Sequence, residues 1–166
     1  THTDSSAASD VYKRQSDRRA DSIESLSDPR VFRAAGGSER ADSVLSGLQA
    51  IAPYASSDDW VLVHDAARPC ISVSVLRQLI DHTVASGVGT VLAQASTDTL
   101  KRVSSSMRVS ESLDRRVVWR AQTPQMFRLS ELETALSSAL SEHLPITDES
   151  MACLLYTSDA ADESVC

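Results

Sequence analysis

Apolar residues in the middle of the chain fall into short continuous runs and longer stretches with helical spacing. One stretch carries apolar side chains on a single helix face: Val44, Leu45, Leu48, Ile51 and Ala52. This spacing predicts an amphipathic helix over residues 39–52, which Pro53 ends. Short strands are predicted on either side of it, at 30–35 and 60–64, and the second is expected to be buried on both faces.

A second helix is predicted after the strand at 60–64. Ser72 is suited to its N-terminal cap and Gly87 to its C-terminal turn. Its expected buried stripe is Leu76, Leu79, Ile80, Thr83 and Val84. A further strand is predicted at 89–95. Because strands and helices alternate, the pattern indicates an α/β domain with parallel strands and right-handed crossovers.

The pattern changes after Ala95. Residues 98–103 and 115–122 are strand-like and separated by a polar stretch, which predicts an arm that leaves the main sheet. Ser130 and Glu133 then form a capping box that opens a helix. The apolar face of this helix is Leu132, Ala135, Leu136, Ala139 and Leu140. Thr147 is expected to cap a last helix.

Composition narrows the class of protein. The chain has 166 residues, which fits one domain, and no apolar run approaches the roughly 20 residues that span a bilayer. We therefore expect a soluble protein. The net charge of −7 argues against a nucleic-acid partner, although local arginines can still hold a small anionic substrate. The three cysteines match no zinc or redox motif, which favours a reducing compartment.

Both ends of the chain lack sustained periodicity and resemble translated sequencing-adapter read-through. We expect residues 1–15 and 153–166 to be non-native flanks, and residues 16–152 to be the native part.

The stretch WVLVHDAARP, residues 60–69, carries the clearest candidate chemistry. Ligands collect outside the carboxyl ends of parallel strands, where Asp65 and Arg68 are expected. A carboxylate there suits Mg²⁺, and a guanidinium suits phosphate oxygens. The alternative is an ion pair between Asp65 and Arg68 that stabilises a turn before Pro69. The small side chains of Ala66 and Ala67 favour function, because a ligand can approach the backbone closely.

Gly36 and Gly37 precede the first predicted helix and offer backbone approach and free N–H groups to an anion or a base. A glycine pair by itself is more often just an ordinary strand-to-helix turn. Neither GxGxxG nor GxxxxGK[ST] occurs. His64 is expected to be packed and hydrogen-bonded, Cys70 to be buried, and Trp119 to lie in the core.

Five blocks of sequence stand in order: GGSERADSVLSGL (36–48), WVLVHDAARPCIS (60–72), DTLKR (98–102), LDRRVVWRAQTPQMF (113–127) and ITDES (146–150). Together they resemble the 2-C-methyl-D-erythritol 4-phosphate cytidylyltransferases of non-mevalonate isoprenoid biosynthesis. The resemblance covers essentially all of residues 16–152. It implies a partial Rossmann-like nucleotidyltransferase domain, with a mainly parallel sheet, helices on both faces and a protruding β-arm at about residues 98–122.

The resemblance also implies an activity and its residues. The enzymes of this family join CTP to methylerythritol phosphate with Mg²⁺ and release pyrophosphate. The CTP side would include Gly37, Arg40, Ser43 and Asp65. The methylerythritol phosphate side would include Asp65, Ala66, Arg68, Thr99, Arg115, Thr123 and Thr147. Asp65 and Arg115 would be catalytic, Asp65 by holding the metal and Arg115 by positioning the attacking phosphate. Helix capping explains Thr147 as well, and a strand position explains Thr99.

The family's arm hooks onto a second subunit, which implies a homodimer with Thr99 and Arg115 in the partner's site. A bacterial cytoplasmic enzyme is implied. The family's glycine-rich basic loop and C-terminal lysine have no counterpart in this sequence, so we expect a central fragment with little or no activity. Two other functions stay open: a ribitol 5-phosphate cytidylyltransferase, and a non-catalytic nucleotide-binding module.

Overall fold

The computed structural model describes the backbone of residues 10–13 and 31–162, and the side chains of residues 31–156. The chain forms two compact units. One unit, here called the core unit, combines the chain up to Val61 with the chain from Phe127 onward. The other, the arm unit, is Leu62–Met126.

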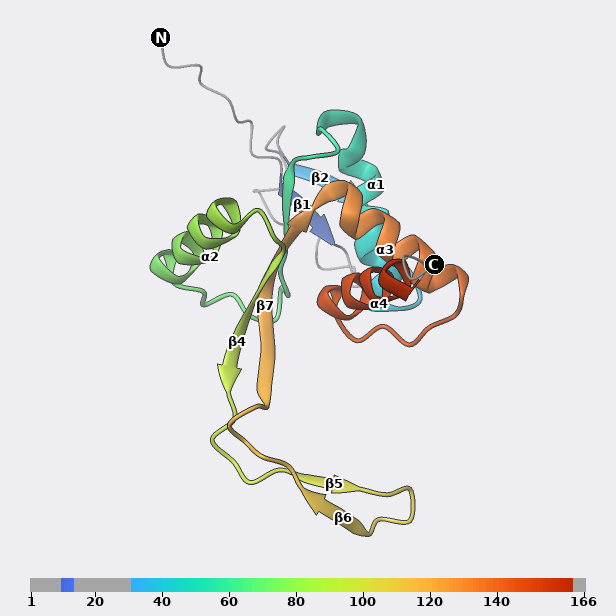
Figure 1. Ribbon diagram of the computed structural model, residues 1–166. Helices are drawn as coiled ribbons and strands as arrows, with labels where there is room; N and C mark the ends of the chain where they lie inside the picture. The colour runs from blue at the N-terminus through green and yellow to red at the C-terminus, as the bar shows by residue number, and fades with distance from the viewer. Residues whose placement is uncertain (1–9, 14–30, 163–166) are drawn as a thin grey trace. The chain divides into compact units, whose positions relative to one another are not determined.

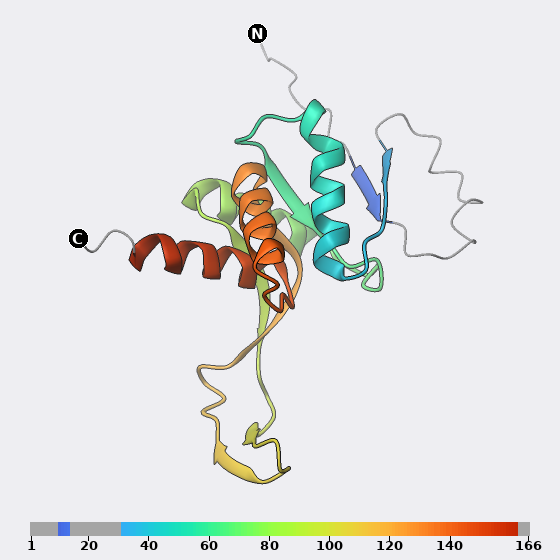
Figure 2. The same cartoon turned by 90° about the vertical axis from the view of Figure 1, so that its right-hand side faces the viewer.

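The core unit contains a pair of parallel strands and three α-helices. Its elements are β1 (Asp10–Lys13), β2 (Val31–Ala34), α1 (Arg40–Ile51), the 3₁₀ turn η3 (Ala52–Tyr54), α3 (Leu129–Ser141) and α4 (Glu149–Asp162). Strand β1 runs parallel to β2, and α1 packs against both. Helix α3 lies beside α1 and also packs against α4 (Figure 2). The assignment of residues 1–15 and 153–166 as flanks stays a prediction.

The predicted apolar face of α3 is the centre of the core unit. Leu132 and Leu136 are fully buried, and Ala135 and Ala139 beside them are almost so. On α1, Leu48 and Ile51 are buried as expected. Burying apolar surface on neighbouring turns of two helices is what holds such helices together.

Helix α3 begins two residues earlier than the capping-box prediction, which was wrong. Its N-cap is Arg128, and Ser130 lies inside the helix. The amides of Leu129 and Ser130 donate to the carbonyl oxygens of Asp59 and Ser57, at 2.9 and 3.0 Å. The turn before β3 therefore satisfies the free N–H groups that a serine cap would otherwise have bound.

Helix α4 is capped by Asp148 rather than by Thr147. The Asp148 carboxylate accepts the amide of Met151 at 3.0 Å, while the Thr147 hydroxyl donates to the Met151 sulfur at 3.4 Å. An aspartate directly before a helix is favoured because its charge also suits the helix dipole. The prediction of Thr147 as the cap was wrong by one residue.

The arm unit contains one helix and most of the remaining strands. Helix α2 (Val73–Ser86) packs against β4 (Thr90–Ala95). Its predicted caps are confirmed, because Ser72 accepts the amide of Val75 and Gly87 has φ of 71°. Leu79 and Thr83 of the predicted stripe are buried, whereas Val84 is 56% exposed.

Strands β3 (Trp60–Val63), β7 (Trp119–Arg128) and β4 form a three-stranded sheet in the order β3-β7-β4. Strand β7 is antiparallel to β4, with Ala93 opposite Ala121. The alternation of strands and helices gave no sign that a later strand would lie between β3 and β4. Within the described residues β3 is thus an edge strand, and Leu62 is 39% exposed, so the prediction of burial on both faces was wrong.

The arm extends from β4 and β7 and ends in a hairpin (Figure 1). The hairpin pairs β5 (Lys101–Val103) with β6 (Val109–Ser112), in antiparallel register. Residues 109–112 belong to the polar stretch between the two predicted strand-like segments, so this strand was missed, and the second predicted segment, 115–122, enters β7 only at Trp119. An exposed hairpin lacks a buried face, so its polar strand carries no alternating pattern. Trp119, expected in the core, is 59% exposed on this arm.

None of the helices in the described part of the chain is both long and apolar enough to cross a membrane.

Truncating Leu136 tests the packing of the core unit. We expect Leu136→Ala to lower the free energy of unfolding by about 2–5 kcal/mol, because it leaves a cavity among buried side chains. Urea denaturation followed by circular dichroism measures the change. Ser137→Ala, at the exposed neighbouring position, is the control and should change it by less than about 0.5 kcal/mol. Equal effects of the two variants would contradict the packing of α3 described here.

Candidate functional site

The loop after β3 is a tight turn that brings Asp65 and Arg68 together. The amide of Arg68 donates to the Asp65 carbonyl oxygen at 2.9 Å, and the Arg68 Nε lies 3.3 Å from Asp65 Oδ2. The Arg68 side chain is 48% exposed and the Asp65 side chain 32%. The ion pair between Asp65 and Arg68, which was the alternative to a binding role, is therefore present. It lies at the surface, where such a pair contributes at most about 1 kcal/mol to stability.

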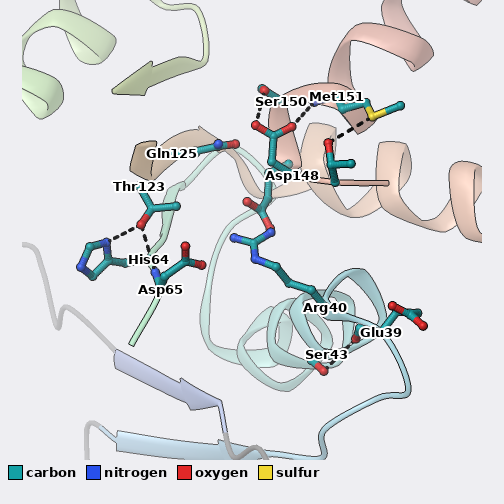
Figure 3. Close-up of polar contacts among 12 residues, drawn as sticks. Glu39, Arg40, Ser43, His64, Asp65, Thr123, Gln125, Asp148, Ser150 and Met151 are labelled. Carbon is teal, nitrogen blue, oxygen red and sulfur yellow. Dashed lines mark hydrogen bonds and ion pairs between the residues drawn. The ribbon is translucent and has the colours of Figure 1, made fainter. Parts of the chain in front are cut away.

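The Thr123 hydroxyl joins this loop to β7. It accepts the amide of Asp65 at 3.2 Å and lies 3.0 Å from Nδ1 of His64 (Figure 3). The other ring nitrogen of His64, Nε2, lies 2.8 Å from the Arg68 carbonyl oxygen. The side chains of Thr123 and His64 thus hold the loop at its two ends, at Asp65 and at Arg68 respectively. His64 is hydrogen-bonded as predicted, but it is exposed rather than packed.

The Arg68 side chain makes a second contact between this loop and β7. Its Nη1 donates to Oε1 of Gln122 at 2.8 Å. Gln122 was not among the site residues predicted from the sequence. Together with Asp65 it fixes the plane of the guanidinium, while about half of the Arg68 side chain stays accessible. A planar guanidinium held in this way is suited to binding a phosphate through its remaining N–H groups.

Thr99 and Arg115 lie on the arm, and both are exposed. Nη1 of Arg115 donates to the Thr97 carbonyl oxygen at 3.0 Å. The neighbouring Arg116 binds Asp114 and holds the pKa of that carboxyl below its ordinary value. Asp114 therefore stays ionised and paired with Arg116.

The N-terminus of α1 uses several of its N–H groups internally. The Gly37 amide donates to the Ser43 hydroxyl at 2.8 Å, and that hydroxyl donates to the Glu39 carbonyl oxygen at 3.1 Å. Asp42 accepts the Glu39 amide and the Ser38 hydroxyl, which lower the pKa of its carboxyl. The expectation that Gly37 offers a free N–H group was wrong, because Ser43 is buried one turn into the helix and takes it.

Arg40, which is half-exposed, forms an ion pair with the buried carboxylate of Glu149. Nη1 of Arg40 binds Oε1 of Glu149, which is 1% exposed. The pair joins the first residues of α1 and α4. Oε2 of Glu149 has no hydrogen-bond partner among the residues that the structure describes. Losing Arg40 would leave a buried carboxylate uncompensated, which is strongly destabilising. Arg40 therefore has a structural role beside the one expected from sequence.

Cys70 differs from expectation. It is exposed rather than buried, because it lies in the loop after Pro69 outside any strand or helix. No group of three or more acidic, histidine or cysteine side chains in the described residues could hold a metal ion.

The family model for 2-C-methyl-D-erythritol 4-phosphate cytidylyltransferase matches residues 4–157. The chain belongs to this cytidylyltransferase family. The enzyme of that name from Ectopseudomonas mendocina is 53% identical over 127 residues, which are 76% of this chain and 54% of that protein. The one from Pseudomonas aeruginosa is 54% identical over 123 residues, 74% of this chain and 53% of that protein. The chain spans about half the length of these curated relatives.

Solved structures of cytidylyltransferases share the fold. The crystal structure of the enzyme from Francisella tularensis has a TM-score of 0.70 and 36% sequence identity, and the match covers 78% of this chain and 60% of that one. A 4-diphosphocytidyl-2C-methyl-D-erythritol synthase also has a TM-score of 0.70, at 35% identity over 86% of this chain and 65% of that one. The α/β nucleotidyltransferase fold predicted from the sequence is confirmed.

The predicted cytidylyltransferase site falls into separate groups of residues. Within the arm unit, the loop from Asp65 to Arg68 meets Thr123, while Thr99 and Arg115 lie on the arm. Within the core unit, Gly37 and Ser43 are bonded to each other, Arg40 pairs with Glu149, and Thr147 is exposed before α4. The partners Gln122 and Glu149 were missed, because contacts between distant segments leave no local pattern.

Adding a methyl group at Gly37 tests the α1 N-terminus. A Cβ there would lie 2.1 Å from the Cβ of Asp42, so Gly37→Ala must displace the capping segment. We expect a loss of about 1–3 kcal/mol of unfolding free energy, measured by urea denaturation. The control is Ala50→Gly on the same helix, which removes a methyl group without a clash and should lower the free energy of unfolding by about 1 kcal/mol. A Gly37→Ala variant as stable as the parent would rule out this close approach.

The two described cysteines should react at different rates. Burial raises the pKa of the Cys153 thiol to about 12, and three nearby carboxylates add to the effect: Glu131, Glu149 and Asp148. At pH 8 about one Cys153 thiol in ten thousand is therefore ionised, and the thiolate is the reactive form. We expect iodoacetamide to alkylate exposed Cys70 first, as followed by peptide mass spectrometry. In guanidinium chloride the two rates should converge; comparable rates in native buffer would refute the burial of Cys153.

Proposed function

We propose that this chain carries part of the active site of a cytidylyltransferase that makes CDP-methylerythritol and pyrophosphate from CTP and 2-C-methyl-D-erythritol 4-phosphate. A phosphate oxygen of the sugar-alcohol phosphate attacks the α-phosphorus of CTP, and pyrophosphate leaves. Little covalent chemistry is required of the protein in such a step. Positioning the two phosphates and neutralising their charge supply most of the catalysis.

The observation that carries this proposal is the cluster of Asp65, Arg68 and Thr123. A carboxylate, a guanidinium and a hydroxyl from two separate segments meet at an accessible loop. Arg68 has the charge and planar shape to bind the substrate phosphate. The hydroxyl of Thr123 suits the polyol. Ala66 and Ala67 between the charged residues are exposed and leave the backbone approachable.

Arg115 is proposed to position the attacking phosphate, with Thr99 beside it on the arm. Both are exposed, and Arg115 is anchored at one Nη by the Thr97 carbonyl oxygen. Gly37, Arg40 and Ser43 are proposed for the CTP side, and Thr147 for the methylerythritol phosphate side. The bonds among Gly37, Ser43 and Glu39 give that segment a fixed shape against which a base can stack or bind.

Asp65 is the residue proposed to bind Mg²⁺. Mg²⁺ is commonly held by one or two carboxylates together with substrate phosphates, so a single exposed carboxylate beside a phosphate site fits this metal. When bound, Mg²⁺ would offset the negative charge of the triphosphate. The Asp65 carboxylate is kept in place by its own amide on Thr123 and by Arg68.

The same proposal includes a homodimer in a bacterial cytoplasm. An isolated two-stranded hairpin is marginal in water, and β5–β6 carries exposed apolar side chains at Val103, Met107 and Val109. Covering them with a second subunit would stabilise the arm and carry Thr99 and Arg115 to the partner. The similarity to 2-C-methyl-D-erythritol 4-phosphate cytidylyltransferases favours methylerythritol phosphate over ribitol 5-phosphate, and an enzyme over a non-catalytic binding module.

A segment swap tests this function. Residues 31–152 replace the matching segment of the Ectopseudomonas mendocina enzyme, and pyrophosphate release from CTP and methylerythritol phosphate is followed with Mg²⁺. We expect the chimera to be active and to lose activity in EDTA. Asp65→Asn and Arg115→Ala should each lower kcat/KM at least about 100-fold, because each removes a charge that acts on the reacting phosphates.

Matched controls use exposed residues of the same types on α2. Asp81→Asn and Arg77→Ala should leave kcat/KM within about threefold. A folded but inactive chimera, or equal use of ribitol 5-phosphate, would count against the proposed reaction. Loss of activity in the control variants as well would show that the charges act through stability alone.

A further inference from the structure

His64 stands next to the proposed substrate loop, and both of its ring nitrogens are engaged. Nε2 lies 2.8 Å from the Arg68 carbonyl oxygen, which can only accept. Nε2 must therefore carry the proton of the neutral ring. Nδ1, with its lone pair, then faces the Thr123 hydroxyl at 3.0 Å (Figure 3). The hydrogen-bond network thus fixes the tautomer of this histidine.

This tautomer determines which hydrogen bonds the Thr123 hydroxyl donates and which it accepts. A hydroxyl has one proton to donate and two lone pairs. The proton goes to Nδ1 of His64, and one lone pair accepts the amide of Asp65 at 3.2 Å. One lone pair remains. Thr123 is half-exposed, and the remaining lone pair is the one available to a ligand that contacts it.

We propose that His64 is a positioning residue that makes Thr123 an acceptor toward the substrate. Phosphate oxygens accept hydrogen bonds, so a threonine whose only hydroxyl proton is already donated to another group cannot bind them through that hydroxyl. It can accept a hydrogen bond from a polyol hydroxyl. His64 thereby assigns Thr123 to the hydroxyl groups of the sugar-alcohol phosphate and leaves the phosphate to arginine. This inference rests on the proposed function for the nature of the ligand, but not for the tautomer.

The tautomer is tested on the 166-residue chain without any ligand. Long-range ¹H–¹⁵N spectra of the imidazole rings at pH 8 distinguish a proton on Nε2 from one on Nδ1. His64→Gln identifies the His64 signals by their disappearance. We expect the Nε2–H form. A proton on Nδ1, on both nitrogens, or averaged between them would overturn the proposal.

The consequence for binding is tested with two variants and two ligands. Asparagine places its amide near the position of Nδ1 and can still accept from Thr123, whereas glutamine reaches toward the position of Nε2 and cannot. We expect His64→Gln to weaken binding of methylerythritol phosphate about threefold to tenfold, as for one lost hydrogen bond. His64→Asn should restore most of it. Calorimetry measures both, and His82→Gln on α2 is the control.

Inorganic phosphate separates positioning from a merely structural role, because it has no polyol hydroxyl. Its affinity should not change in His64→Gln. If both ligands weaken equally, His64 only supports the loop and the proposal fails. If the parent chain binds methylerythritol phosphate no better than inorganic phosphate, the proposed function and the polyol contact both fail, while the spectra still decide the tautomer.

Discussion

One hydroxyl oxygen, that of Thr123, ties the loop after β3 to strand β7. It accepts the amide of Asp65 and contacts the ring of His64, whose other nitrogen reaches the Arg68 carbonyl oxygen. Without this link, the turn from Asp65 to Arg68 would be joined to β7 through the Arg68 side chain on Gln122, and within itself it would rest on one backbone bond and a surface ion pair, which contributes little. The geometry of the proposed substrate loop therefore depends on β7, a strand that follows it by more than fifty residues.

A corresponding constraint in the core unit is the pair of half-exposed Arg40 and buried Glu149. It fixes the beginnings of α1 and α4 to each other, next to the segment in which Gly37 and Ser43 are bonded. Removing Arg40 is costly, because the buried carboxylate loses its compensation. In the function proposed above, an arginine held in place in this way would be preorganised for a phosphate.

Sequence patterns predicted the local features of this fold well. The apolar stripe around Leu132 and Leu136, the Ser72 cap and the Gly87 turn were all confirmed, because each depends on neighbouring residues. Features set by distant segments were missed or wrong: the position of β7 between β3 and β4, the carbonyl oxygens that cap α3, and the partners Gln122 and Glu149. The hairpin strand at 109–112 was missed because it is exposed throughout and carries no alternating pattern. The site residues came from the family resemblance, and their catalytic roles stay predictions. Their hydrogen-bond partners required the structure.

Amide hydrogen exchange at Asp65 tests the central link most directly. Thr123→Val removes the hydroxyl while keeping the shape of the side chain, and Thr123→Ser keeps the hydroxyl. We expect a protected Asp65 amide in the parent chain and in Thr123→Ser, and loss of that protection in Thr123→Val. Equal protection in all three proteins would contradict it, because the loop would then be held by something other than this oxygen.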